Sequence, residues 1–222
     1  MSPPNSPIMS RSLSLVSCAL ALGAALRLAA HSVWIEPGEG QLVIRFAEPD
    51  GRLEKSPGYL DSLSLPVAFV LVTNAPVLVD APKKSDHFLL VGTSTTNTAC
   101  AETSFTVRGG RKPNFYARWQ PSGFVMAAPM MTLDLVPTDK AGEVRVYLRG
   151  QPLGGVKATL RTPDEKEQEL VADAEGFLRF AASQNGQYLL TIAHQREPIA
   201  GYHGGRAYKE TSHNASLTWR QE

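Results

Sequence analysis

The stretch that decides the fold class is "EVRVYLRGQPLGGVKATLRTPDEKEQELVADAEGFLRFAASQNGQYLLTIAH", Glu143–His194. Apolar and polar residues alternate along it, and clusters of Gly, Pro, Asn and Asp interrupt the alternation about every eight to twelve residues, as in a small antiparallel sandwich. "DAEG" before "FLRF" is typical of a tight turn in which Gly176 supplies a positive φ. The stretch therefore predicts a small antiparallel β-sandwich.

The last strand of this stretch carries one apolar face. Side chains alternate between the two faces of a strand, so Tyr188, Leu190 and Ile192 share a face. His194 follows at the same period of two, and we expect it to continue that face.

Outside this stretch the chain again alternates short β-rich runs with turns, and no long segment has a helical period. We expect an all-β protein with two antiparallel β-sandwich domains of the Ig-like or prealbumin-like kind after a signal peptide. The boundaries fall at residues 1–30 for the signal peptide, 31–137 for the N-terminal β domain and 138–222 for the C-terminal sandwich. Residues 48–63 are expected to hold one helical turn or an ordered loop, residues 76–87 a polar break, and residues 93–104 a loop or edge.

The N-terminus has the pattern of a secretory leader. Leu13–Leu26 is apolar, and Ala30 occupies the small position before a cut. Export to the periplasm with cleavage there leaves His31 as the first residue. An alternative uses "LVSC" as a lipid-attachment signal on Cys18, which makes the protein a lipoprotein.

Composition excludes several classes of function. The formal net charge is +1, so there is no basic field to attract nucleic acid or anionic lipid. After cleavage one cysteine remains, Cys100, which cannot form an internal disulfide and is expected to be a small buried residue. No Gly-x-Ser-x-Gly, phosphate-binding loop or His-Glu-x-x-His motif is present. We expect no enzyme activity and no membrane span in the mature chain.

Histidine is the residue type left to carry chemistry. A histidine at the N-terminus offers its α-amine and its Nδ1 atom, which together close a chelate ring on a metal ion. His194, His203 and His213 are the candidates to complete such a site with His31. A nitrogen-rich site suits Ni²⁺, Co²⁺, Cu²⁺ or Zn²⁺.

Several motifs carry a family resemblance. "AHSVWIEP", "TLDLVP", "GQPLGGVKATL", "DAEGFLRF", "GQYLLTIAH" and "HNASLTW" occur in this order between Ala30 and Trp219. In order and spacing the chain resembles the nickel-uptake substrate-specific region family of exported bacterial proteins, also called domain of unknown function 4198. The C-terminal half also resembles carboxypeptidase-regulatory-like and prealbumin-like sandwiches.

The resemblance implies a periplasmic protein that binds nickel or cobalt and serves an inner-membrane metal importer. His31 matches by position, His213 by its place before the last strand, and His194 by its motif. Family members often begin with Ala-His-Asp/Glu-x-Trp, whereas Ser32 stands here in place of the acid. The missing carboxylate is one that a metal site could use.

Three functions follow from these patterns. The first is transition-metal binding, with nickel as the expected metal, through His31 with His213, His194 or His203. The second is an exported structural or interaction module that binds no metal, since many sandwiches share this pattern. The third is a copper-dependent oxidase with an N-terminal histidine brace, which needs a second histidine close to His31 and an open face for substrate.

Overall fold

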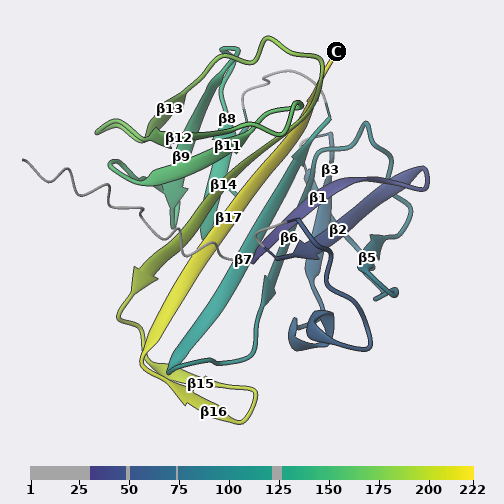
Figure 1. Cartoon of the computed structure of the whole chain (residues 1–222), viewed down its shortest axis with the longest axis vertical. Helices are drawn as coiled ribbons and strands as arrows, with labels where there is room; N and C mark the ends of the chain where they lie inside the picture. Colours follow the sequence, from purple (N-terminus) through teal and green to yellow (C-terminus); the bar gives the residue numbers. More distant parts are fainter. Residues whose placement is uncertain (1–30, 49–50, 74, 122–126) are drawn as a thin grey trace, which may run out of the picture.

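The computed structural model describes residues 31–48, 51–73, 75–121 and 127–222. Its centre is an eight-stranded sheet in the order β12-β11-β14-β17-β7-β6-β3-β4 (Figure 1). The strands are β3 (Val67–Val72), β4 (Ala75–Val79), β6 (Ala99–Ser104), β7 (Arg111–Gln120), β11 (Lys157–Arg161), β12 (Glu167–Val171), β14 (Gly186–Glu197) and β17 (Glu210–Gln221).

Two smaller sheets pack on this central sheet, and a hairpin extends from its end (Figure 1). One sheet contains β1 (Ser32–Gly38), β2 (Gln41–Ala47) and β5 (His87–Leu90). The other contains β8 (Leu133–Pro137), β9 (Glu143–Leu148), β10 (Gln151–Pro152) and β13 (Phe177–Arg179). The hairpin is β15 (Gly201–His203) with β16 (Arg206–Tyr208), and η1 (Tyr59–Ser62) is a single 3-10 turn.

The central sheet separates two hydrophobic cores. In β7, Phe115 and Ala117 belong to the core under the β1-β2-β5 sheet, whereas Tyr116 belongs to the core under the β8-β9-β10-β13 sheet. Strand β17 contributes Ala215 and Leu217 to the core under the β8-β9-β10-β13 sheet. Because side chains alternate across a strand, strands covered on both faces are buried along most of their length. The middle of β17 is accordingly buried at every position from 211 to 219.

The prediction of an all-β protein is confirmed, and its sheets pack on one another as in a β-sandwich. Strand β17 pairs in parallel with β7, with His213 opposite Asn114, so one sheet contains strands from both sides of the expected boundary at residue 137. The division into two domains stays a prediction. The expected leader at 1–30 and Cys18 lie outside the described residues.

Several local expectations are confirmed. A single 3-10 turn lies within residues 48–63. Gly176 has a φ of 86° in the turn before β13, and its amide donates to the Asp173 carbonyl at 3.0 Å. Cys100 is fully buried, and this burial raises the pKa of its thiol to about 12.

Two expectations about the N-terminal half were wrong. Residues 76–87 were expected to form a polar break, but Ala75–Val79 is the edge strand β4. Residues 93–104 were expected to form a loop or edge, but Ala99–Ser104 is the interior strand β6 between β7 and β3. The small residues of β6 lack the bulky apolar pattern of a strand, yet they fit where both faces are covered.

A buried ion pair fixes the position of β8 against β7. Arg118 and Asp134 are fully buried, and two hydrogen bonds of 3.0 and 2.6 Å join the guanidinium to the carboxylate. The same carboxylate accepts the backbone N–H of Met130 at 2.8 Å. Removing one partner would leave a buried charge without its counter-ion, so the pair specifies this packing.

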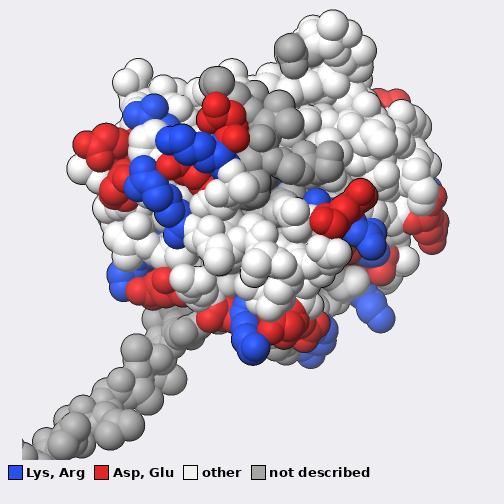
Figure 2. Space-filling model, turned by 90° about the horizontal axis from the view of Figure 1, so that it is seen from above, with Lys and Arg blue, Asp and Glu red and all other residues white. Residues whose placement is uncertain are grey.

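The surface carries both charges. On the face in Figure 2, acidic and basic side chains are interspersed, with uncharged areas between them. Within the described part of the chain, no helix has the length and apolar character needed to cross a membrane.

Candidate metal centre and adjoining pocket

His31 is brought beside two glutamates by the pairing of β1 with β2. In this antiparallel register Ser32 lies opposite Ala47, so His31 and Glu48 follow at the same end of the ladder. The chain then turns back along β2, where the amide of Glu54 donates to the Phe46 carbonyl at 2.8 Å. Both carboxylates therefore reach the same place as the imidazole.

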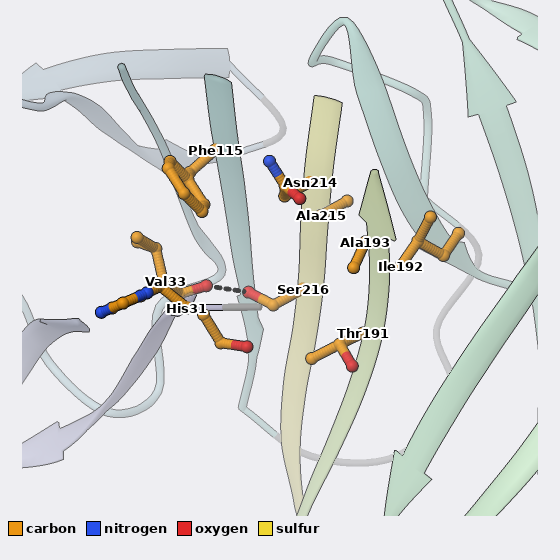
Figure 3. Close-up of a pocket in the computed structure, with 10 residues that line it drawn as sticks. His31, Val33, Phe115, Thr191, Ile192, Ala193, Asn214, Ala215 and Ser216 are labelled. Atoms are coloured by element: carbon orange, nitrogen blue, oxygen red, sulfur yellow. Dashed lines mark hydrogen bonds between the residues drawn. The ribbon is translucent and has the colours of Figure 1, made fainter. Parts of the chain in front are cut away.

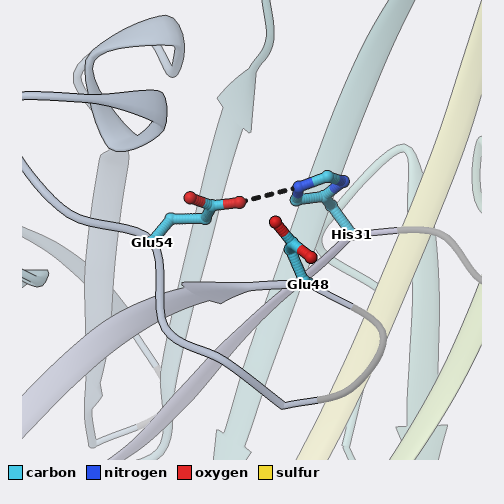
Figure 4. Close-up of side chains that lie close together, drawn as sticks. All are labelled: His31, Glu48 and Glu54. Carbon is cyan, nitrogen blue, oxygen red and sulfur yellow. Dashed lines mark hydrogen bonds and ion pairs between the residues drawn. The ribbon is translucent and has the colours of Figure 1, made fainter.

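The three side chains form a compact group of possible metal ligands. The Nε2 atom of His31 lies 2.9 Å from Oε1 of Glu54. One ligand atom each from His31, Glu48 and Glu54 lies within 4.8 Å of the other two (Figure 4). The side chains of His31 and Glu54 are 31% and 14% exposed, so solvent can reach the group. In Figure 4 the second ring nitrogen of His31 points away from both glutamates.

Aromatic packing fixes the orientation of the His31 ring. Its centroid lies 5.0 Å from that of Phe46 and 5.1 Å from that of Tyr59. The start of β1 is in turn attached to β17, because the Ser216 hydroxyl donates to the Val33 carbonyl at 2.7 Å (Figure 3). The imidazole is therefore held by packing as well as by Glu54.

His213, expected as the main partner of His31, lies on the other face of the central sheet. Its neighbours Ser212 and Asn214 line the pocket beside His31, so the side chain between them points the opposite way. There Nε2 lies 2.8 Å from Oε2 of Glu197 and Nδ1 lies 2.9 Å from the hydroxyl of Tyr116. Burial lowers the pKa of His213, with the Glu197 carboxylate opposing the shift. Both ring nitrogens are already engaged, and neither faces His31.

His194 does not continue the apolar face of β14, which corrects the expectation from its spacing. The register between β14 and β17 shifts between Ile192 and Gln195, which is a β-bulge. His194 has a φ of 60° in this bulge, and its amide donates to Oδ1 of Asn214 at 3.0 Å. Tyr188, Leu190 and Ile192 are buried on one face as expected. The bulge places His194 in the pocket that His31 also lines.

His203 lies on the β15-β16 hairpin. Its Nε2 atom is 3.4 Å from the hydroxyl of Ser104, and its pKa is lowered by burial and by the charge of Lys112. No described contact joins it to His31. Of the four predicted ligands, the structure brings His31 and His194 to one pocket and places His203 and His213 elsewhere.

Sequence reasoning missed Glu48 and Glu54. Both lie in "EPDGRLEKSPG", whose turn residues predicted only a loop. A hairpin register for Ser32–Gly38 and Gln41–Ala47 would have placed residue 48 beside residue 31, but β1 was not expected as a strand.

The chain matches no protein-family model and no curated protein.

Proposed function

We propose that this protein is an exported binding protein for a divalent transition-metal ion, held by His31, Glu48 and Glu54. The observation that carries the proposal is the approach of the three ligand atoms to within 4.8 Å of one another. Nitrogen and oxygen ligands roughly 2.0–2.2 Å from one metal ion lie at most about 4.4 Å apart, so a small movement of these side chains would bring all three atoms onto one ion.

The donor set suits nickel. An imidazole nitrogen with carboxylate oxygens suits Ni²⁺, Co²⁺, Cu²⁺ and Zn²⁺ better than a site made of carboxylates alone. Nickel is the metal that the family resemblance implies. Three protein ligands on a partly exposed site leave positions open on the ion. An ion with open positions can be passed by ligand exchange to another protein, as delivery to an inner-membrane importer requires.

The histidine can bind an ion in two ways, and the first of them uses the two glutamates as ligands. In the first, Nε2 of His31 binds the metal together with both glutamates. In the second, cleavage before His31 frees its α-amine, the amine and Nδ1 chelate the ion, and Glu54 accepts the Nε2–H hydrogen bond. A carboxylate that holds the far nitrogen of a ligating histidine is a common supporting contact. The contact between Nε2 and Glu54 favours neither mode over the other.

Calorimetric titration with Ni²⁺ tests the proposal on protein that begins at His31 and has been stripped with EDTA. One ion per chain is expected, and Glu54→Gln and Glu48→Gln should each weaken binding roughly tenfold or more. Glu169→Gln, an exposed glutamate paired with Lys157, is the matched control. Equal binding by all four proteins would contradict the proposal and favour an interaction module without metal.

The oxidase alternative needs a second histidine within ligand distance of His31. Among the described residues, the ligand atoms grouped with His31 belong to Glu48 and Glu54, and His194 is not one of them. We therefore place metal binding ahead of copper-dependent oxidation.

A further inference from the structure

The pocket beside His31 is larger than one metal ion requires. Its volume is about 270 Å³, and His31 lies at its wall. Pockets that take small organic molecules are concave, mostly apolar and furnished with a few polar groups. The composition of this wall can therefore be used to infer the kind of molecule it fits.

Four aromatic rings supply the apolar part of the wall. They come from β2, η1, the segment after β6, and β7: Phe46, Tyr59, Phe105 and Phe115. The Phe46 ring packs 5.8 Å from Phe105 and 6.0 Å from Phe115, so the rings form one cluster. Aromatic walls favour a flat apolar ligand that can stack or pack edge-on.

Two arginines give the pocket a positive side. The guanidinium carbon of Arg108 lies 4.8 Å from the centre of the Tyr59 ring, and Arg108 forms no ion pair with any residue that the structure describes. The Nε atom of Arg111 lies 3.5 Å from Oε1 of Glu210, which is a long ion pair. An arginine positioned on an aromatic ring and lacking a carboxylate partner is well placed to bind one.

His194, which also lines the pocket, lies in this positive field. Burial lowers the pKa of His194, and the charges of Arg111 and Arg196 lower it further. The Nδ1 atom of His194 is buried and has no hydrogen-bond partner among the described residues. A buried polar atom of this kind is satisfied when water or a ligand bonds to it.

We propose that this pocket binds a small aromatic carboxylate, with the ring against Phe46, Phe105 and Phe115 and the carboxylate paired with Arg108 and Arg111. Glu48 and Glu54 are not among the described residues that line this pocket. The two arginines therefore set the position of the carboxylate. Binding of this ligand does not depend on the metal site.

The test uses indole-3-acetate and its neutral amide, indole-3-acetamide, titrated into protein that begins at His31 in the presence of EDTA. The acid should bind, and the amide should bind at least roughly tenfold more weakly because it lacks the charge that the arginines pair with. Arg108→Gln should weaken binding of the acid by a similar factor, and Arg108→Lys by less. The imidazole resonances of His194 should shift on addition of the acid.

The matched control is Arg145→Gln. Arg145 also lies over an aromatic ring, 4.7 Å from the centre of Phe177, but far from this pocket in the fold, on β9. This variant should bind the acid as the wild type does. Equal binding of acid and amide, no effect of Arg108→Gln, or no binding of the acid at millimolar concentration would overturn the proposal. Retained binding in Glu54→Gln separates it from the metal site.

Discussion

The imidazole Nε2 of His31 lies 2.9 Å from the carboxylate Oε1 of Glu54, across twenty-three positions of sequence. This contact joins the residue that precedes β1 to the loop that follows β2. Glu48 completes the group, and the rings of Phe46 and Tyr59 fix the imidazole. The proposed metal site depends on this arrangement of side chains.

Adding one residue before His31 distinguishes the two coordination modes. Protein with a glycine before His31 keeps Nε2, Glu48 and Glu54 but has no free histidine amine. If Nε2 binds the ion, calorimetry should show unchanged Ni²⁺ affinity. A loss of roughly a hundredfold or more, with Glu54→Gln also weakened, would assign the amine chelate instead.

Acidification should destabilise the fold before the carboxylates titrate. Burial lowers the pKa values of His194, His203 and His213 below the ordinary histidine value of 6.5. The unfolded chain then binds these protons at a higher pH than the folded chain does. The contribution of these three histidines to the free energy of unfolding should therefore be complete above pH 6.5. The free energy of unfolding should fall as the pH drops below that value.

Urea denaturation between pH 7.5 and 5.5 measures this effect. His213→Gln should reduce the dependence on pH, because it removes one of the three groups. A free energy of unfolding that stays constant, or that rises as the pH is lowered from 7.5 to 5.5, would contradict this prediction.

The buried pair between Arg118 and Asp134 should be costly to break. Arg118→Met leaves the Asp134 carboxylate buried without its counter-ion and should lower the free energy of unfolding by about 3–5 kcal/mol. Adding Asp134→Asn should recover part of that loss, since no charge then remains buried. Urea unfolding of both variants measures the difference, and a double variant less stable than Arg118→Met would argue against the explanation.

Cys100 should be unreactive in the folded protein. With a thiol pKa of about 12, on the order of one thiol in ten thousand is ionised at pH 8, and the side chain is fully buried. A thiol reagent such as DTNB should label protein beginning at His31 only after urea is added. Rapid labelling of the native protein would show that the β6-β7 core opens readily.

Period-two patterning was sufficient to predict the all-β class and the buried face of β14, because alternation directly reports a half-buried strand. It failed at β6, where Ala99, Cys100 and Ala101 lie between two cores and carry no alternation. It also failed at His194, because one bulge reverses the face of every residue that follows.

The site was predictable only in part for the same reason. His31 stood out beside the expected cleavage point, but Glu48 and Glu54 become its neighbours through hairpin register and a return of the chain. His213 was attractive by sequence position, and a single step of strand alternation places it on the opposite face. Such contacts depend on pairing between distant strands, which spacing along one chain does not reveal.

The most direct test of the metal site is anomalous scattering at the nickel edge from crystals of Ni²⁺-loaded protein that begins at His31. The account predicts one strong peak roughly 2.0–2.2 Å from a nitrogen of His31 and from at least one carboxylate oxygen of Glu48 or Glu54. A peak beside His203 or His213, or none near His31, would contradict it.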